Sequence, residues 1–319
     1  MSATGTKTLP YGQAAIAEAA RVIAGGGCVA VPTETVYGLA ADATDSAAVA
    51  SIYAAKGRPS FNPLIVHVPD LAAAEALAVF DDAARALAVR FWPGPLTLVV
   101  PVRAGAVSSL VTAGLDTVAI RVPAHRAMQA LLRACGTPLA APSANASNRI
   151  SPTRAEHVLA TLDGRIALVI DDGPTTSGLE STIVDARTGE ILRPGPITSQ
   201  ILFPGEGRGA DTTRPETGPR PSPEHVMAPG QLASHYAPSK PLRLNATSAR
   251  PGEWLIGFGA TTGDDTLSAS GDLTEAAARL FDALHRADAS DRAAIAVAPV
   301  PTGGLGDAIN DRLRRAAHR

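Results

Sequence analysis

Apolar positions recur with a helical period in several stretches of the first 204 residues. Isoleucine and alanine side chains at positions 16, 19, 20 and 23 share one face, which predicts a helix over residues 11–24. Asp45 precedes an alanine-rich stretch and is predicted to cap a second helix. Thr153 and Glu156 have the spacing of a capping box ahead of a further helix.

Short apolar, often β-branched runs lie between these helical stretches and predict strands. Several of the runs follow one another without an intervening helix, so a twisted mixed sheet is favoured over a regular doubly wound one. The fold class is therefore predicted as α/β. The predicted strands of this part of the chain are residues 28–31, 63–68, 96–102, 117–122, 166–170 and 181–184.

The pattern changes between Gly205 and Gly230, where 26 residues contain ten glycines and prolines and no apolar period. Such a stretch predicts a linker that is partly extended because of its prolines. Beyond it, strand and helix patterns alternate, which predicts a smaller, Rossmann-like three-layer domain. The predicted organisation is a large domain over 1–204, a linker over 205–238 that also acts as a lid, and a small domain over 239–319.

Composition indicates a globular protein of ordinary charge. Hydrophobic residues make up 45% of the chain and charged residues 18%, enough to bury a sizeable core. The net charge of −2 comes without a basic tail, so direct contact with nucleic acid is expected to be weak or absent. Two isolated cysteines, no signal-peptide pattern and no apolar run of about 20 residues indicate a cytoplasmic protein without a membrane span.

Common catalytic motifs are absent from the sequence. There is no P-loop motif, no CxxC or HExxH motif and no GxSxG elbow, which argues against a P-loop nucleotidase, a zinc enzyme and a serine hydrolase. We therefore expect no metal held by protein side chains. A glycine-rich turn at 303–306 could cradle a phosphate, although such turns are more often simple connections.

Four polar segments follow predicted strands or end helices in the first two hundred residues. Each has a simple structural explanation, such as a polar turn or cations that complement a helix dipole. Together they are harder to dismiss, because strand ends are where α/β proteins assemble binding sites. A lysine and an arginine in one of them also suit a triphosphate. The four segments are 32–38, 55–63, 141–147 and 179–185, the last followed by 192–195.

These segments carry a family resemblance. PTETVYGL, KGRP, PLIVHV, IRVP, APSAN and STIVD occur in this order, and together they resemble the YrdC/Sua5 family of threonylcarbamoyl-AMP synthases over residues 11–203. The APGQLASHYAP segment at 228–238 and the small domain that follows are similar to the long, two-domain Sua5 form. The resemblance implies a YrdC-like catalytic domain, and a linker that folds back over the nucleotide.

The resemblance implies a nucleotidyltransferase. Family members are expected to combine L-threonine, bicarbonate and ATP, with Mg²⁺ held through the ATP phosphates, into threonylcarbamoyl-AMP and pyrophosphate. The product would pass to the t6A transferase machinery, which modifies position 37 of tRNAs. An RNA-binding module of the same fold, acting in tRNA or ribosome maturation without turnover, is the main alternative. A carbamoyl-adenylate step of hydrogenase maturation fits less well, because the zinc-finger cysteines are missing.

The resemblance also assigns roles to individual residues. The family's KxR and SxN signature falls on Lys56, Arg58, Ser143 and Asn145, which are the expected catalytic residues. Arg121 suits an amino-acid carboxylate on physical grounds, because a guanidinium binds it with two hydrogen bonds. The expected ATP-binding residues are Lys56, Arg58, Asn62, Thr117, Ser143, Ser151, Arg193 and Tyr236. The expected threonine-binding residues are Thr35, His67, Arg121, Ala141 and Ser181.

Overall fold

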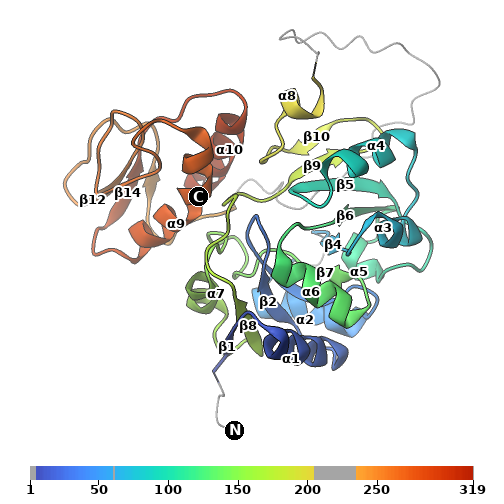
Figure 1. Cartoon of the computed structure of the whole chain (residues 1–319). Coiled ribbons are helices and arrows are strands. Elements are labelled where there is room, and N and C mark those ends of the chain that lie inside the picture. Colours follow the sequence, from blue (N-terminus) through green and yellow to red (C-terminus); the bar gives the residue numbers. More distant parts are fainter. Residues whose placement is uncertain (1–4, 60–61, 205–234, 319) are drawn as a thin grey trace.

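A ten-stranded mixed sheet forms the centre of the N-terminal domain (Figure 1). The computed structural model describes residues 5–59, 62–204 and 235–318, so most of the predicted lid, 205–234, lies outside the described residues. Parallel and antiparallel neighbours mix within the sheet, as expected. The strand order is β1 (Lys7–Pro10), β8 (Leu168–Asp171), β2 (Val29–Pro32), β3 (Tyr37–Asp42), β7 (Leu139–Ala140), β4 (Ile65–His67), β6 (Thr117–Arg121), β5 (Leu96–Pro101), β9 (Thr182–Asp185) and β10 (Ile191–Arg193).

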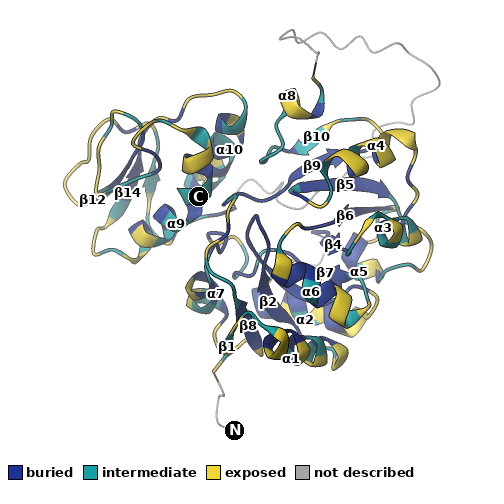
Figure 2. Cartoon of the chain, in the orientation of Figure 1, coloured by how far each residue is buried: buried dark blue, intermediate teal, exposed yellow. Residues whose placement is uncertain are grey.

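Helices cover one face of this sheet along its length and the other face over β8, β2, β3 and β7, and most of the strands are buried (Figure 2). The edge strand β1 is largely exposed. In β2, Val29 and Val31 pack against one helical layer while Ala30 packs against the other, because successive side chains of a strand point to opposite faces. The first layer holds α1 (Gln13–Ala24) and α6 (Arg126–Cys135). The second holds α2 (Ser46–Lys56), α3 (Leu71–Leu77), α4 (Asp82–Phe91), α5 (Ser109–Thr112) and α7 (Ala155–Leu162).

One of the two predicted helix caps is confirmed and the other is wrong. Asp45 caps α2 as expected, because its carboxylate accepts a hydrogen bond from the Ala47 backbone amide. The prediction of a capping box at Thr153 is wrong, because α7 begins after Arg154 and no side chain caps it. The Thr153 hydroxyl lies 3.3 Å from Nδ1 of His157 instead, so the histidine draws it away from the helix amides.

A separate four-stranded parallel sheet forms the small domain, in the order β11 (Leu242–Arg243), β14 (Ala294–Val297), β12 (Glu253–Gly257) and β13 (Asp265–Thr266). Its helices α9 (Leu273–Ala289) and α10 (Leu305–Ala317) pack in one apolar cluster with Ile256 and Ile295. Both helices therefore cover the same face. The second helical layer of the expected three-layer domain is not found within 235–318, because the β11–β12 connection contains no helix.

The small domain packs closely against the segment that leads into β9. Gly178 has a φ of +68°, and a Cβ there would lie 2.4 Å from the Ala277 carbonyl oxygen in α9. Leu179 belongs to the same apolar cluster as Phe281 of α9. The absence of a side chain at Gly178 therefore allows the backbone of the large domain to rest directly on the small domain.

Polar contacts cross the same interface. Arg154 Nε donates to Asp282 of α9 over 3.0 Å. The rings of His157 and His285 stack with their centroids 3.8 Å apart and 14° between their planes. Arg312 of α10 also reaches into the large domain.

Among the residues described, no helix has both the length and the apolar character needed to cross a membrane.

Candidate functional site

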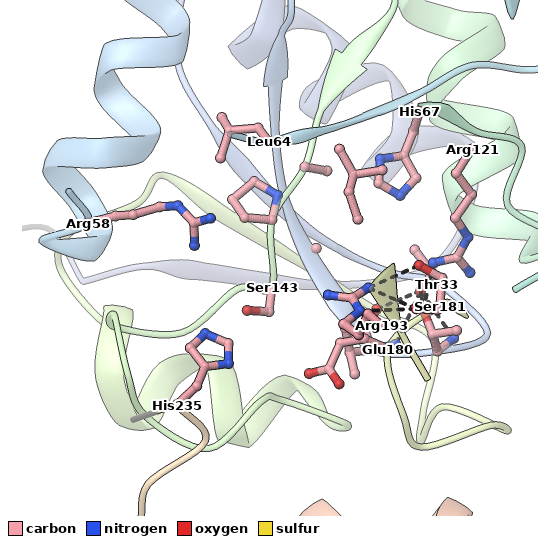
Figure 3. A pocket seen from close by; sticks show the side chains of 16 residues that line it. Thr33, Arg58, Leu64, His67, Arg121, Ser143, Glu180, Ser181, Arg193 and His235 are labelled. Carbon is pink, nitrogen blue, oxygen red and sulfur yellow. Dashed lines mark hydrogen bonds between the residues drawn. The ribbon is translucent and has the colours of Figure 1, made fainter. Parts of the chain in front are cut away.

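A pocket lies where loops from both halves of the large sheet converge. Arg58, Ser143 and His235 lie toward one side, whereas His67 and Arg121 lie toward the other (Figure 3). All four polar segments singled out in the sequence contribute to the pocket. The lining residues are Thr33, Thr35, Val36, Gly38, Arg58, Leu64, Ile65, His67, Arg121, Ala141, Pro142, Ser143, Glu180, Ser181, Arg193 and His235.

Arg121, at the end of β6, is a buried cation with spare donor capacity. Its Nε donates to the Gly94 carbonyl oxygen over 3.1 Å, and its Nη1 donates to the Thr35 hydroxyl over 2.8 Å. Its Nη2 forms an ion pair with Glu34, whose Oε1 lies 2.6 Å away, so three of the five N–H groups of the guanidinium are engaged. Burial opposes the ionisation of Glu34, but Arg121 outweighs it and keeps the pKa of that carboxyl below its ordinary value.

His67 lies beside Arg121, because β4 and β6 pair in register at these two residues. Burial, aided by the charge of Arg121, lowers the pKa of His67 to about 3, so the imidazole is neutral at pH 7. Its Nδ1 is buried and has no hydrogen-bond partner within the part of the chain that the structure describes. A buried polar atom without a partner is unfavourable, so we expect Nδ1 of His67 to form a hydrogen bond with a ligand.

Lys56 is the last residue of α2 and is buried, contrary to the expectation that it lies in a polar loop. Its Nζ donates to the carbonyl oxygens of Ser143 and Asn145, each over 2.5 Å. Burial, followed by the charge of Arg58, lowers the pKa of Lys56 well below its ordinary value. The lysine of the KxR signature therefore holds the backbone of the SxN segment in place.

Arg58 follows Gly57, whose left-handed conformation ends α2 and turns the chain toward the pocket. Its guanidinium donates to the carbonyl oxygens of Asn62 and Pro63, over 3.4 and 3.2 Å. Burial lowers the pKa of Arg58 to about 10, which still leaves it cationic at pH 7. Asn62 is buried behind it and does not line the pocket.

Ser181 and Arg193 lie side by side in the pocket, next to Thr33 and Glu180 (Figure 3). The Ser181 hydroxyl lies 2.7 Å from that of Thr97 and accepts a hydrogen bond from Arg193 Nη2 over 3.1 Å. Arg193 also donates to the Ser181 carbonyl oxygen. Ser181 directly precedes β9 and Arg193 ends β10. The antiparallel pairing of these two strands therefore brings the hydroxyl and the guanidinium together.

The structure does not bring every expected residue to the pocket wall. Thr117 lies at the other end of β6 from Arg121, about 13 Å away at the usual rise of a strand. Asn145 is buried behind Ser143, where its Nδ2 donates to the Arg149 carbonyl oxygen. Ser151 and Tyr236 are also fully buried and do not line the pocket.

Several lining or supporting residues were missed in the sequence. Thr33 and Glu34 stand inside the PTETVYGL motif, and Glu180 directly precedes Ser181, so their positions were a usable signal. His235 lies beside Tyr236, with the two rings 3.9 Å apart. Arg312, 132 residues beyond Glu180, had no sequence signal, because only the packing of the small domain brings it near.

Carboxylates near the pocket are already engaged by cations. Glu34 pairs with Arg121 and Glu180 with Arg312. Within the described residues, no group of three or more His, Cys, Asp or Glu side chains is placed to hold a metal ion. The donor set that faces the pocket consists of guanidinium and hydroxyl groups, which bind oxyanions.

Comparison with known proteins agrees with this geometry. Residues 21–195 match the Sua5/YciO/YrdC family model, described as "Telomere recombination", and residues 197–318 match the model of the C-terminal domain of threonylcarbamoyl-AMP synthase. Threonylcarbamoyl-AMP synthase of Bacillus subtilis is 42% identical over 95% of this chain and 92% of its own length. The enzyme of that name from Pyrococcus abyssi is 39% identical over 94% and 93%.

A solved structure extends the comparison to the whole fold. P. abyssi Sua5 complexed with L-threonine superposes with a TM-score of 0.82 and 36% identity, and covers 98% of this chain and 97% of that one. The mixed α/β fold class and the two-domain resemblance are thereby confirmed. The chain therefore belongs to the Sua5/YciO/YrdC family, in the long form that carries the Sua5 C-terminal domain.

Proposed function

We propose that this protein is a threonylcarbamoyl-AMP synthase that joins L-threonine, bicarbonate and ATP and releases pyrophosphate and water. The proposal rests chiefly on Arg121, a buried guanidinium that lines the pocket and keeps N–H donors beyond those engaged by Gly94, Thr35 and Glu34. A guanidinium in this state suits an amino-acid carboxylate. The names of the relatives and the threonine complex of P. abyssi Sua5 support the same substrate.

Threonine would occupy the side of the pocket formed by Arg121, His67 and Thr35. Arg121 would bind the carboxylate, while the neutral His67 would exchange a hydrogen bond with the threonine side chain or amine. Ala141 and Ser181 would complete this wall. Such placement holds the amine in one orientation, where it can attack CO₂ and form a carbamate.

ATP would occupy the other side, where Arg58, Ser143 and Arg193 face the pocket. These groups would neutralise the triphosphate while the carbamate oxygen attacks the α-phosphorus and pyrophosphate departs. Lys56 and Asn145 would contribute by holding the SxN backbone. We also assign Asn62, Thr117, Ser151 and Tyr236 to ATP binding on the strength of the family resemblance, from positions behind the wall.

Mg²⁺ is proposed to arrive with ATP, where it would neutralise phosphate charge. The pairing of Glu34 and Glu180 with arginines supports this, since neither carboxylate is free to bind a cation without losing its partner. Mg²⁺ commonly binds through substrate phosphates in such sites. The product would pass to the t6A transferase machinery for tRNA modification. The unpaired Cys28 and Cys135 support a reducing, cytoplasmic location.

The decisive assay measures pyrophosphate release from ATP and bicarbonate with and without L-threonine. Release that depends on both threonine and bicarbonate is the expected result. Equal release without threonine would overturn the proposed reaction. Binding of tRNA without any nucleotide turnover would favour an RNA-binding module instead.

A further inference from the structure

Arg312 lies on α10 of the small domain, yet its charged group is buried against the large domain. Its side chain is 0% exposed. Its Nε donates to Glu180 Oε2 over 2.8 Å, and its Nη1 donates to Asp311 over 2.9 Å. A buried guanidinium is costly unless it is paired. The contact with Glu180 is thus a specific connection between the domains rather than an incidental one.

Glu180 is an unusual residue for this pocket. It is the one carboxylate among the described residues that line the cavity, while the other charged lining groups are arginines. Its Oε1 accepts a hydrogen bond from the Ser151 hydroxyl over 2.5 Å. A bare carboxylate here would repel the phosphates of a nucleotide, because like charges interact strongly when water is excluded.

We propose that Arg312 is a positioning residue for nucleotide binding, which neutralises and orients Glu180 so that the pocket accepts the phosphates of ATP. This inference rests on the proposed function. The small domain then forms part of the nucleotide site, because α10 supplies the charge that offsets Glu180. The same contact fixes the Glu180 oxygen that holds Ser151.

The charges that surround Glu180 agree with this role. Burial raises the pKa of Glu180, but the charges of Arg312 and Arg193 outweigh it and leave the pKa below its ordinary value. The carboxylate is therefore ionised at neutral pH, and its charge must be offset. Arg193 donates to Ser181, whereas Arg312 donates to Glu180 itself. The guanidinium of Arg312 also lies 5.4 Å from the ring centroid of Tyr236.

A simpler role for Arg312 is to fasten the two domains together. The chain offers a control for that role, because Arg154, whose side chain is 39% exposed, donates to Asp282 across the same interface over 3.0 Å. Neither Arg154 nor Asp282 lines the pocket. Loss of Arg154 removes a contact between the domains and leaves the charge balance at Glu180 intact.

The experiment measures the Kd of Mg-ATP by calorimetry, without threonine or bicarbonate, for wild type, Arg312→Met, Arg312→Met with Glu180→Gln, and Arg154→Met. We expect Arg312→Met to raise the Kd at least about tenfold at pH 7.5, because it leaves Glu180 unpaired. Added Glu180→Gln should restore the Kd to within about threefold, since it removes the repelling charge. Arg154→Met should stay within about twofold of wild type.

The pH dependence of the Kd for ATP distinguishes this role of Arg312 from that of a simple contact between the domains. Without Arg312, the pKa of Glu180 rises, so acidification from pH 7.5 to 6 should protonate it and recover part of the ATP affinity of Arg312→Met. An unchanged Kd in Arg312→Met, or a loss that Glu180→Gln does not restore, would overturn the inference.

Glu180→Gln alone keeps the inference testable if Arg312→Met does not fold. This variant keeps the shape of the side chain and should bind ATP at least as tightly as wild type; a Kd raised about tenfold would mean that the carboxylate itself binds the ligand. ATP binding by a wild-type protein that releases no pyrophosphate with threonine would contradict the proposed function alone.

Discussion

Lys56 Nζ lies 2.5 Å from the backbone carbonyl oxygen of Ser143. The lysine and the serine of the two signature segments are therefore joined before any substrate binds. This bond and its neighbour to Asn145 hold the end of α2 against the loop after β7.

Lys56→Ala should lower pyrophosphate release about 100-fold or more, because the loop that carries Ser143 loses the hydrogen bonds that hold it in position. The same change should reduce the free energy of unfolding by about 1–3 kcal/mol, since two buried carbonyl oxygens lose their donor. Lys240→Ala is the control: Lys240 also donates to two carbonyl oxygens, in the small domain. Equal losses of activity in both variants would contradict a local role for Lys56.

Arg121→Lys should raise the KM for threonine about tenfold or more and change the KM for ATP much less. Lysine keeps the charge but lacks the planar fork whose separate nitrogens contact Gly94, Thr35 and a carboxylate. Steady-state kinetics with each substrate varied in turn measures the difference. Arg126→Lys, at an exposed ion pair with Asp172, should leave both values unchanged. An unaltered threonine KM in Arg121→Lys would remove Arg121 from the threonine site.

The stacked His157–His285 pair should make stability depend on pH. Burial, followed by the charge of His285, lowers the pKa of His157 to about 3, and burial lowers that of His285 to about 4. Both pKa values lie below that of an unfolded histidine, so the neutral pair stabilises the fold fully above about pH 6.5 and loses this effect as the pH falls. Each histidine should cost about 1.4 kcal/mol per pH unit between pH 6.5 and its folded pKa.

Urea unfolding between pH 7.5 and 4.5 measures this dependence. His157→Gln should reduce the proton uptake on unfolding by about one, relative to wild type. The exposed His318 provides a control, because His318→Gln removes a histidine that lies outside the interface. Identical pH slopes for wild type and His157→Gln would show that the stacked pair does not couple stability to pH.

Gly178→Ala should weaken the docking of the small domain. The new Cβ would meet the backbone of α9 and would also sit at a positive φ, two effects that together cost about 2–5 kcal/mol. Gly173→Ala carries the second effect alone, since Gly173 has a φ of +77° and no atom within 4 Å of an added Cβ. Thermal unfolding should separate the two variants. Equal melting temperatures would mean that backbone strain alone accounts for the change.

Local patterns were sufficient for much of the fold. The helical spacing at 16, 19 and 23 and the β-branched run at 117–122 predicted α1 and β6 correctly. The edge strand β1 and the strand β3 were missed. β3 begins inside PTETVYGL, whose polar residues are typical of a turn, and β1 depends on pairing with β8, which lies far away in the sequence.

The candidate site, like the fold, could be predicted only in part from the sequence. The sequence determined which segments carry the chemistry, because the signature residues are contiguous and their order along the chain is enough to identify the family. Only the tertiary structure decided that Lys56 is buried, that Thr117 does not line the pocket, and that Arg312 meets Glu180. These relationships arise from strand pairing and domain packing. Arg312 and Glu180, for example, are 132 positions apart, and local sequence patterns do not encode such contacts.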